Sequence, residues 1–419
     1  MTENSVPATL IGPTLADMQI ARGTVAAVAQ VTPVETSRFL SELLGSPVLL
    51  KCENLQRTGS YKIRGAFNRL SALSTEERSR GVVAASAGNH AQGVALGARE
   101  LGIEATIFMP TNVPLPKLEA TRDYGAQVVL SGSVFGETLA AAAAFAEETG
   151  AIFIPPYDHP AVVAGQSTIA FELLEQVPDL DTVVVPIGGG GLISGIASAF
   201  KQLAAAGGRP VRVIGVQAEN AASYIASLEA GTPVNIPFKP TIADGIAVYR
   251  PGELNYLMIQ DAVDEIVTVS EDDAARALLV LMERAKLVVE PAGAVSVAAL
   301  LAGKISGTGT TVAILSGGNI DPLLMQRVIS HGLAASDRYL TMRVMLMDRP
   351  GELARVATIL AGVRANVIEV LHTQHGPDLQ ITEVELDITV ETRGPAHVEE
   401  VLAALRADGY EPKLDKRRN

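Results

Sequence analysis

Short apolar runs rich in β-branched residues alternate with helix-like segments along most of the chain, and this alternation constrains the fold more than any other feature. Because parallel strands need crossover connections, which are usually helical and right-handed, the pattern predicts an α/β fold with doubly wound parallel sheets. The predicted strands are, in chain order, 47–52, 81–85, 105–109, 127–130, 152–154, 183–185, 211–216 and 312–315. The predicted helices are 14–30, 37–44, 91–101, 116–124, 135–147, 165–176, 192–205 and one that begins near residue 63.

The pattern changes near the end of the chain, at about residues 333–338. A βαββαβ order follows, which predicts a ferredoxin-like unit. Its expected elements are strands at 339–347, 366–370, 381–391 and 410–414, and helices at 350–361 and 395–406. We therefore expect a main region over residues 1–332, with a small subdomain of about 50–155 inserted in it. A linker at 333–338 and a second domain at 339–415 would complete the chain.

Composition limits the possible partners. The 419 residues are 48% hydrophobic, enough for a sizeable core, and the net charge of −13 comes from acidic and basic residues that are interspersed. This charge pattern argues against nucleic acid and anionic membranes as partners. The single cysteine, Cys52, excludes an internal disulfide and suits a reducing compartment. With no apolar leader at the first residues and with charges inside the apolar window 277–302, we expect a cytoplasmic protein with no membrane partner.

Four consecutive glycines, Gly188 to Gly191, follow one predicted strand and precede the helix that begins near Leu192. Glycine lets the backbone approach an anion closely, and a helix N-terminus directs N–H groups at it, so a phosphate is the expected guest. A dinucleotide fold is the alternative, because Gly189, Gly191 and Gly195 nearly match its spacing. That reading expects an acid at the end of the next strand, where this chain has Gln217.

Lys62 follows a Thr-Gly-Ser-Tyr turn and precedes a segment with helical apolar spacing. A lysine at a helix start, near the positive end of the dipole and partly removed from water, favours the neutral amine. A neutral amine is the form that makes a Schiff base. Taken alone, this stretch is more typical of a solvated loop than of a Schiff-base lysine.

Two further polar stretches end predicted strands. Ser86 to His90 offers a hydroxyl, an amide and N–H groups that suit a carboxylate; an ordinary N-cap by Ser86 or Asn89 would explain one residue of the five. Ser316 follows the strand 312–315. Polar residues at the carboxyl ends of several parallel strands indicate a small-molecule site.

The stretches around Lys62, 86–90, 188–192 and 316–319 together resemble the serine/threonine dehydratases that use pyridoxal 5'-phosphate, with the tryptophan-synthase-β-like fold (fold type II). The resemblance covers most of residues 15–325. It implies that Lys62 holds the cofactor, that Tyr61 packs beside it, and that Asn89 and Ser316 contact its ring. The phosphate would bind at Gly188, Gly189, Gly190, Gly191 and Leu192. The substrate carboxylate would bind at Ser86, Ala87, Gly88, Asn89 and His90, with His90 packing rather than acting as a base. Two other segments, 244–248 and 290–293, also match family segments near the cofactor, and Glu290 is either functional or a helix cap.

The resemblance implies deamination and dehydration of L-threonine to 2-oxobutanoate and ammonia, and of L-serine to pyruvate. The alternatives are a serine racemase or β-substituting synthase, and a non-catalytic amino-acid sensor. Similar racemases use a serine at the position of Ala87, whose methyl group carries no proton. No metal site is expected, because Gln217 and Ser223 stand where some relatives have metal-binding acids, and His372 and His375 lack further ligands nearby.

Asp348, Gly351 and Leu353, together with Asn366, resemble the amino-acid-binding ACT module. Gly351 permits close backbone approach, and the helix start after it suits a carboxylate. The alternative is a Pro-Gly turn in a module that only dimerises. We expect a homo-oligomer, a tetramer by resemblance, with an effector amino acid such as isoleucine or valine bound between paired modules.

Overall fold

The computed structural model describes residues 11–374 and 379–414. His375 and residue 415 lie outside these ranges. The chain divides into two compact units, Met1–Pro322 and Leu323–Asn419, and each is described by itself. Within the described residues, helices that combine the length and the apolar character needed to cross a membrane are absent.

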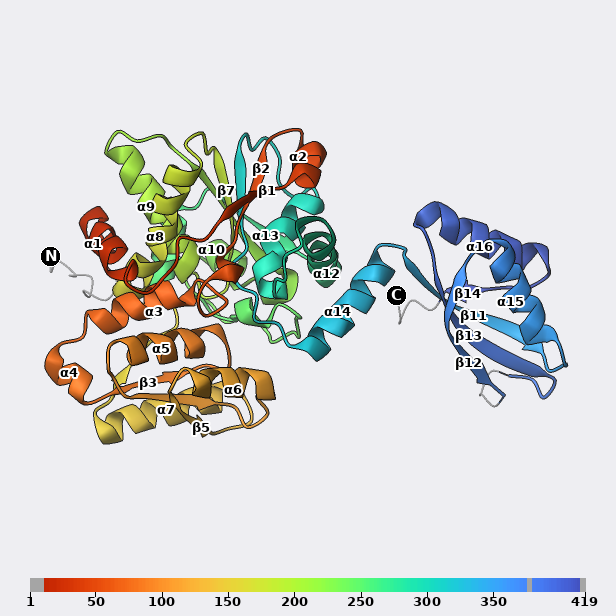
Figure 1. The fold of residues 1–419 in the computed structure, drawn as a ribbon, viewed down its shortest axis with the longest axis horizontal. Helices are drawn as coiled ribbons and strands as arrows, with labels where there is room; N and C mark the ends of the chain where they lie inside the picture. The colour runs from red at the N-terminus through yellow and green to blue at the C-terminus, as the bar shows by residue number, and fades with distance from the viewer. Residues whose placement is uncertain (1–10, 375–378, 415–419) are drawn as a thin grey trace. The chain divides into compact units, whose positions relative to one another are not determined.

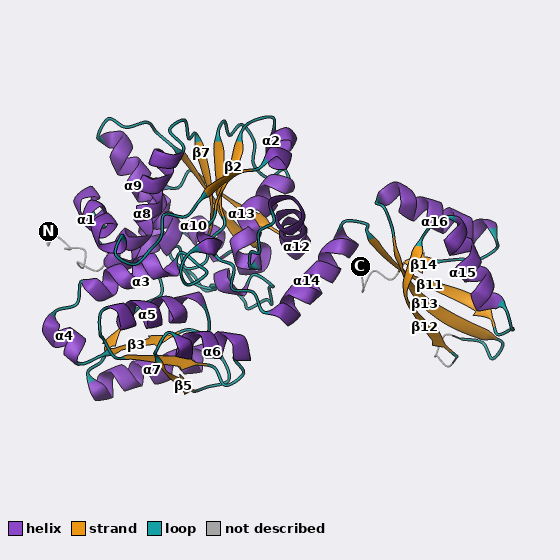
Figure 2. Cartoon of the chain, viewed as in Figure 1, coloured by secondary structure: helices purple, strands orange, loops and turns teal. Residues whose placement is uncertain are grey.

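A six-stranded sheet forms the centre of the first unit, with the order β1-β2-β10-β7-β8-β9. All neighbouring pairs are parallel except β1 with β2, which confirms the predicted parallel α/β class. Helix α9 packs on one face and α13 on the other, as the layers in Figure 2 show. The strands are β1 (Val34–Thr36), β2 (Val48–Lys51), β7 (Thr182–Pro186), β8 (Arg212–Ala218), β9 (Glu265–Val269) and β10 (Thr311–Ile314).

A second, four-stranded parallel sheet has the order β5-β4-β3-β6. Alternate residues of β3 face opposite helices, as expected for a strand covered on both sides. Val82 and Ala84 pack in the cluster that contains α5, whereas Val83 and Ala85 pack with Ala142 of α7. The strands are β3 (Val82–Ala85), β4 (Ala105–Met109), β5 (Gln127–Leu130) and β6 (Ile152–Phe153).

Helix α3 joins the two sheet layers, because it packs against α5 beside the smaller sheet and against α8 beside the larger one (Figure 1). The helices of this unit are α1 (Leu15–Val25), α2 (Arg38–Leu44), α3 (Lys62–Ser71), α4 (Thr75–Ser79), α5 (Asn89–Glu100), α6 (Leu115–Asp123), α7 (Phe135–Thr149), α8 (Pro160–Gln176), α9 (Gly191–Ala205), α10 (Ser223–Ala230), α11 (Glu253–Ala262), α12 (Glu271–Val280) and α13 (Pro291–Leu301).

A buried cluster of ion pairs fixes α3 in this position. The Arg64 side chain is 1% exposed and forms hydrogen-bonded ion pairs with Glu53 at 2.8 Å and with Glu172 of α8 at 2.6 Å. Lys51, at the end of β2, contacts Glu172 at 2.6 Å. Burial alone would raise the pKa of Glu53, but attraction and hydrogen bonds from Arg64 outweigh it, so the pKa lies below its ordinary value. The cluster therefore ties α3 to the larger sheet and to α8 through charges that compensate one another.

The second unit contains an antiparallel sheet with the order β12-β13-β11-β14. Every second residue of β13 is buried, and these residues share one core with α15 and α16, so the two helices cover one face. This βαββαβ unit agrees with the ferredoxin-like prediction. Its elements are β11 (Tyr339–Met347), α15 (Glu352–Gly362), β12 (Asn366–Thr373), β13 (Glu383–Glu391), α16 (Pro395–Ala407) and β14 (Lys413–Leu414). Helix α14 (Pro322–Ala335) precedes them in the chain and begins at the last residue of the first unit.

The buried cluster gives a stability prediction. Replacing Arg64 by methionine keeps much of the volume but leaves Glu53 buried beside Glu172 without its guanidinium partner. We expect the free energy of unfolding to fall by about 3–5 kcal/mol, measured by denaturant unfolding followed by circular dichroism. Arg38 pairs with Glu42 on the surface of α2, and Arg38→Met should change stability by less than about 0.5 kcal/mol. Equal effects of the two substitutions would contradict this account.

Candidate functional site

Three neighbouring strands of the larger sheet bring the predicted stretches to one edge. Strands β2, β10 and β7 are parallel, so the segments after their carboxyl ends lie together. The segment after β2 leads to Lys62, the segment after β10 contains Ser316, and the glycine run follows β7. Direct contacts join the first two: Ser60 forms an isolated bridge with Gly317, and the Tyr61 N–H donates to the Ser316 carbonyl at 3.2 Å.

Lys62 is the first residue of α3, so its backbone lies at the helix start that the sequence predicted. The residue is partly buried, and its Nζ donates to the Pro156 carbonyl at 3.1 Å and lies 5.3 Å from the centre of the Tyr61 ring. Removal from water lowers the pKa of Lys62 to about 8, although the charge of Glu290 opposes this shift. A substantial fraction of the amine is therefore neutral near pH 8.

The glycine run forms the start of α9, with Gly190 at φ +88° as the residue before the helix. A Cβ atom at Gly189 would lie 2.1 Å from the Tyr157 ring, and one at Gly190 would lie 2.2 Å from the Tyr224 hydroxyl oxygen. Neither position has room for a side chain. Among the described residues, no side chain caps this helix start, so its first N–H groups are available to a ligand.

The loop from Ser86 leads into α5, whose first residue is Asn89. The His90 ring is buried, and its Nε2 lies 2.9 Å from the Ile154 carbonyl oxygen. Because a carbonyl only accepts, Nε2 carries the proton. Burial lowers the pKa of His90 to about 3, so the ring is neutral, and its Nε2 contacts Ile154, the residue after β6. This placement agrees with a packing role for His90.

Glu290 immediately precedes α13, and its side chain makes no capping hydrogen bond to this helix. It is 6% exposed, and its Oε1 accepts a hydrogen bond from Asn89 Nδ2 at 2.7 Å. Burial, helped by the charge of Asp244, raises the pKa of Glu290 to about 7. The carboxyl group therefore contacts Asn89 and does not cap α13.

Sequence reasoning missed the residues that support the glycine run. The Tyr224 hydroxyl and Asn255 Nδ2 both donate to the Gly189 carbonyl at 3.0 Å, and Tyr157 packs against Gly189 and Gly191. These residues come from distant segments and belong to no short motif, so the fold alone reveals them. Asn319, by contrast, belongs to the Ser-Gly-Gly-Asn stretch and donates to Asn89 Oδ1 at 2.8 Å.

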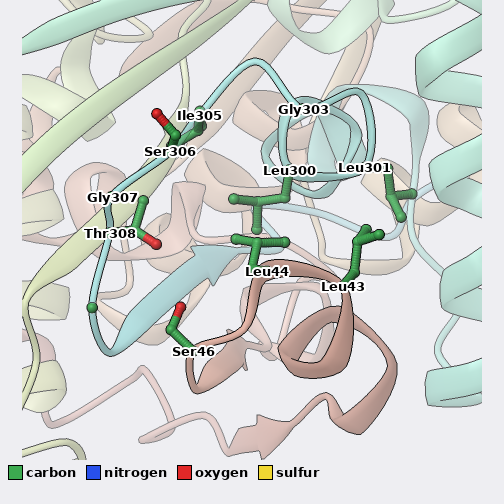
Figure 3. Close-up of a pocket in the computed structure, with 11 residues that line it drawn as sticks. Leu43, Leu44, Ser46, Leu300, Leu301, Gly303, Ile305, Ser306, Gly307 and Thr308 are labelled. Atoms are coloured by element: carbon green, nitrogen blue, oxygen red, sulfur yellow. The ribbon is translucent and has the colours of Figure 1, made fainter.

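A cavity of about 500 Å³ lies at the other edge of the larger sheet. Residues that precede β2 and β10 line it, including Ser46 and Thr308, whereas the predicted site follows the carboxyl ends of these strands. Leucines of α2 and α13 face one another across this space (Figure 3). The cavity is therefore separate from the Lys62 site, and the predicted site residues are absent from its described lining.

The family model described as "Pyridoxal-phosphate dependent enzyme" matches residues 25–317, and the chain belongs to this family. Pyridoxal phosphate is therefore its cofactor. The chain is 48% identical over 402 residues to an L-threonine ammonia-lyase of Thermotoga maritima, covering 96% of this chain and 99% of that protein.

Solved structures give the same fold. The processed form of threonine deaminase isoform 2 from Solanum lycopersicum is 38% identical with a TM-score of 0.71, covering 79% of this chain and 99% of that one. Maize serine racemase is 35% identical with a TM-score of 0.71, covering 77% and 99%. The tryptophan-synthase-β-like fold (fold type II) expected from the sequence is therefore confirmed.

The residues present fit the cofactor. An aldehyde needs a neutral amine, which Lys62 supplies near pH 8. A phosphate needs N–H donors at close range, and the uncapped start of α9 has glycines where a Cβ would collide with its surroundings. Asn89 and the buried Ser316 add polar groups at the same sheet edge.

Proposed function

We propose that this chain is an L-threonine ammonia-lyase that converts L-threonine to 2-oxobutanoate and ammonia and also acts on L-serine. The observation that carries the proposal is the Lys62 amine, lowered in pKa and placed at the sheet edge that also holds the glycine run and Ser316. The substrate assignment rests on the L-threonine ammonia-lyase of Thermotoga maritima, which matches almost the whole chain.

Each residue has a distinct role in this proposal. When bound, pyridoxal phosphate supplies the electron sink that stabilises negative charge at the α-carbon of an amino acid. Lys62 binds the cofactor and then takes the α-proton at Nζ as general base. Tyr61 packs beside the cofactor, N–H groups from Gly188 to Leu192 hold its phosphate, and the loop from Ser86 to His90 holds the substrate carboxylate. The β-hydroxyl group then leaves as water, so that the α-proton and the hydroxyl group are lost together as one H2O, and the enamine that results hydrolyses in water to the keto acid and ammonia.

Of the two proposed contacts to the cofactor ring, the one from Ser316 favours elimination over transamination. Asn89 would bond the ring oxygen, and Ser316 would present a neutral hydroxyl to the pyridine nitrogen. A neutral partner leaves that nitrogen unprotonated, which discourages transamination.

Racemisation is the second candidate, since maize serine racemase has the same fold. A racemase needs an acid or base on each side of the α-carbon. Ala87 occupies the loop position where similar racemases have a serine, and its methyl group moves no proton. We therefore propose elimination as the main reaction.

Substitution of Lys62 tests the proposal. Lys62→Ala should lose the visible absorbance of the lysine-bound cofactor and reduce 2-oxobutanoate formation from L-threonine by at least about a thousandfold, because both attachment and proton transfer are lost. The exposed Lys304→Ala is the matched control and should retain activity. Product analysis with L-serine should find pyruvate in large excess over D-serine. Retained turnover in Lys62→Ala, or D-serine forming as fast as pyruvate, would contradict the proposal.

We propose further that the second unit is an ACT-type regulatory domain that binds an amino acid. Gly351 has φ +98° directly before α15, and side-chain caps are absent from this helix start among the described residues. Such a start suits a carboxylate. Leu353 is 45% exposed and Asp348 is exposed beside it, so both side chains can contact a ligand.

Asn366 lies at the other end of the same sheet. Strand β11 ends at Met347, which pairs with Glu383, whereas Asn366 begins β12 and pairs with Glu391, eight positions along β13. That separation is about 26 Å. One copy therefore does not bring Asn366 to Gly351, which supports a site shared between two copies.

Strand β12 supports pairing of two copies. It is an edge strand, and apolar side chains such as Ile368, 48% exposed, and Leu371 are open to solvent along it. An unpaired apolar edge is a template for a second strand. We propose a homo-oligomer, a tetramer by family resemblance, located in the cytoplasm, where the buried free thiol of Cys52 stays reduced.

Effector titration tests the regulatory domain. Isoleucine or valine should change threonine kinetics of the full chain severalfold, and a chain that ends at residue 336 should lose this response and assemble into smaller oligomers. Kinetics and light scattering measure both effects. Asp348→Ala should weaken the response with little change in basal activity. Identical kinetics and assembly for the two chains, with and without effector, would contradict the proposal.

A further inference from the structure

Glu290 is a buried acid that the reaction proposed above does not use. Its Oε1 lies where a side chain of Gly317 would be, since a Cβ added there would approach it to 2.3 Å and Asn89 Nδ2 to 3.1 Å. Asp244, Lys117 and Lys62 act on it electrostatically. A carboxyl group buried between the Ser316 segment and α5 is costly to remove from water, so we expect it to have a function at this position.

A chain of hydrogen bonds determines which way the Asn89 amide points. Asn319 Nδ2 donates to the Thr58 carbonyl at 2.7 Å, and a carbonyl can only accept, so the orientation of Asn319 is fixed. The same Nδ2 donates to Asn89 Oδ1 at 2.8 Å. Asn89 Nδ2 must then face Glu290 Oε1, which accepts at 2.7 Å. In the flipped amide, two donors would meet at Asn319 and two acceptors at Glu290.

We propose that Glu290 is a positioning residue that holds the Asn89 amide with its second N–H directed at the ring oxygen of pyridoxal phosphate. The inference rests on the proposed contact between Asn89 and that oxygen. Glu290 acts through Asn89 and touches neither the cofactor nor the substrate. Asn319 fixes the oxygen end of the amide, and Glu290 fixes the nitrogen end.

The charge of Glu290 is secondary to its accepting oxygen. A protonated carboxyl group keeps a carbonyl oxygen, so the bond from Asn89 survives protonation. The pKa of Glu290, raised to about 7 by burial and Asp244, means that both forms occur near neutral pH. Glutamine also offers a carbonyl oxygen at this position, whereas methionine offers only a weak acceptor.

A mutant cycle on cofactor affinity tests the inference. The apoprotein is titrated with pyridoxal phosphate, and Kd is followed by absorbance. Glu290→Met should raise Kd about tenfold, the equivalent of one hydrogen bond, and Glu290→Gln should stay within about threefold of wild type. Asn89→Ala should raise Kd similarly, and the double variant Asn89→Ala/Glu290→Met should be no weaker than Asn89→Ala. The exposed Glu147→Gln is the control.

Each outcome decides the inference. Additive losses in the double variant would mean that Glu290 acts independently of Asn89, and an unchanged Kd for Glu290→Met or Asn89→Ala would also overturn it. If Glu290→Met does not fold, Asn319→Ala frees the other end of the amide and should weaken binding only when Asn89 is present; a loss that persists without Asn89 would contradict the inference. Cofactor affinity is read without substrate, so absence of threonine turnover would overturn the proposed function and leave this test intact.

Discussion

The buried ion pairs of Arg64 are the constraint on which the rest of the catalytic region depends. Arg64 lies two residues after Lys62 and contacts Glu53 beyond β2 and Glu172 on α8. Removing such charges from water is costly, and the cost is offset only while each charge keeps its partners in good geometry. The cluster therefore admits one placement of α3 between the two sheet layers. Because Lys62 is the first residue of this helix, the cluster also determines where Lys62 lies.

Burial gives Lys62 its chemistry. An ammonium group removed from water loses hydration and releases its proton more easily, whereas Glu290 favours the charged form. Loss of hydration is the larger of these effects and lowers the pKa of Lys62, whereas the attraction of Glu290 limits the fall to about 8. A Glu290 carboxyl group with an ordinary pKa would be ionised and would favour the protonated form of Lys62. Burial raises the pKa of Glu290 as well, which weakens this effect. The two groups thus moderate each other's charge at one end of the sheet.

The strands and the site loops could be predicted because their signals are local. A run such as Val183 to Val185 followed by glycines indicates both a buried strand and an anion site. The first β-strand, Val34–Thr36, was missed because it is short and mostly exposed, and the elements between residues 219 and 310 lack comparable alternation. Tyr224 and Asn255 reach Gly189 only through the fold. The role of Glu290 stayed open because its partner, Asn89, is far away in sequence.

The central claim is that the fold lowers the pKa of Lys62, so that a substantial fraction of its amine is a neutral nucleophile near pH 8. The most direct test is the rate at which the apoprotein binds pyridoxal phosphate between pH 6.5 and about 10, followed by absorbance, in the wild type and in Lys62→Ala. The rate should rise with pH as the amine loses its proton, reach half its maximum near pH 8, the pKa of Lys62, and level off roughly one unit above it; Lys62→Ala should show no such phase. A rate that keeps rising towards pH 10, as for a solvated lysine, or that persists in Lys62→Ala, would contradict the account.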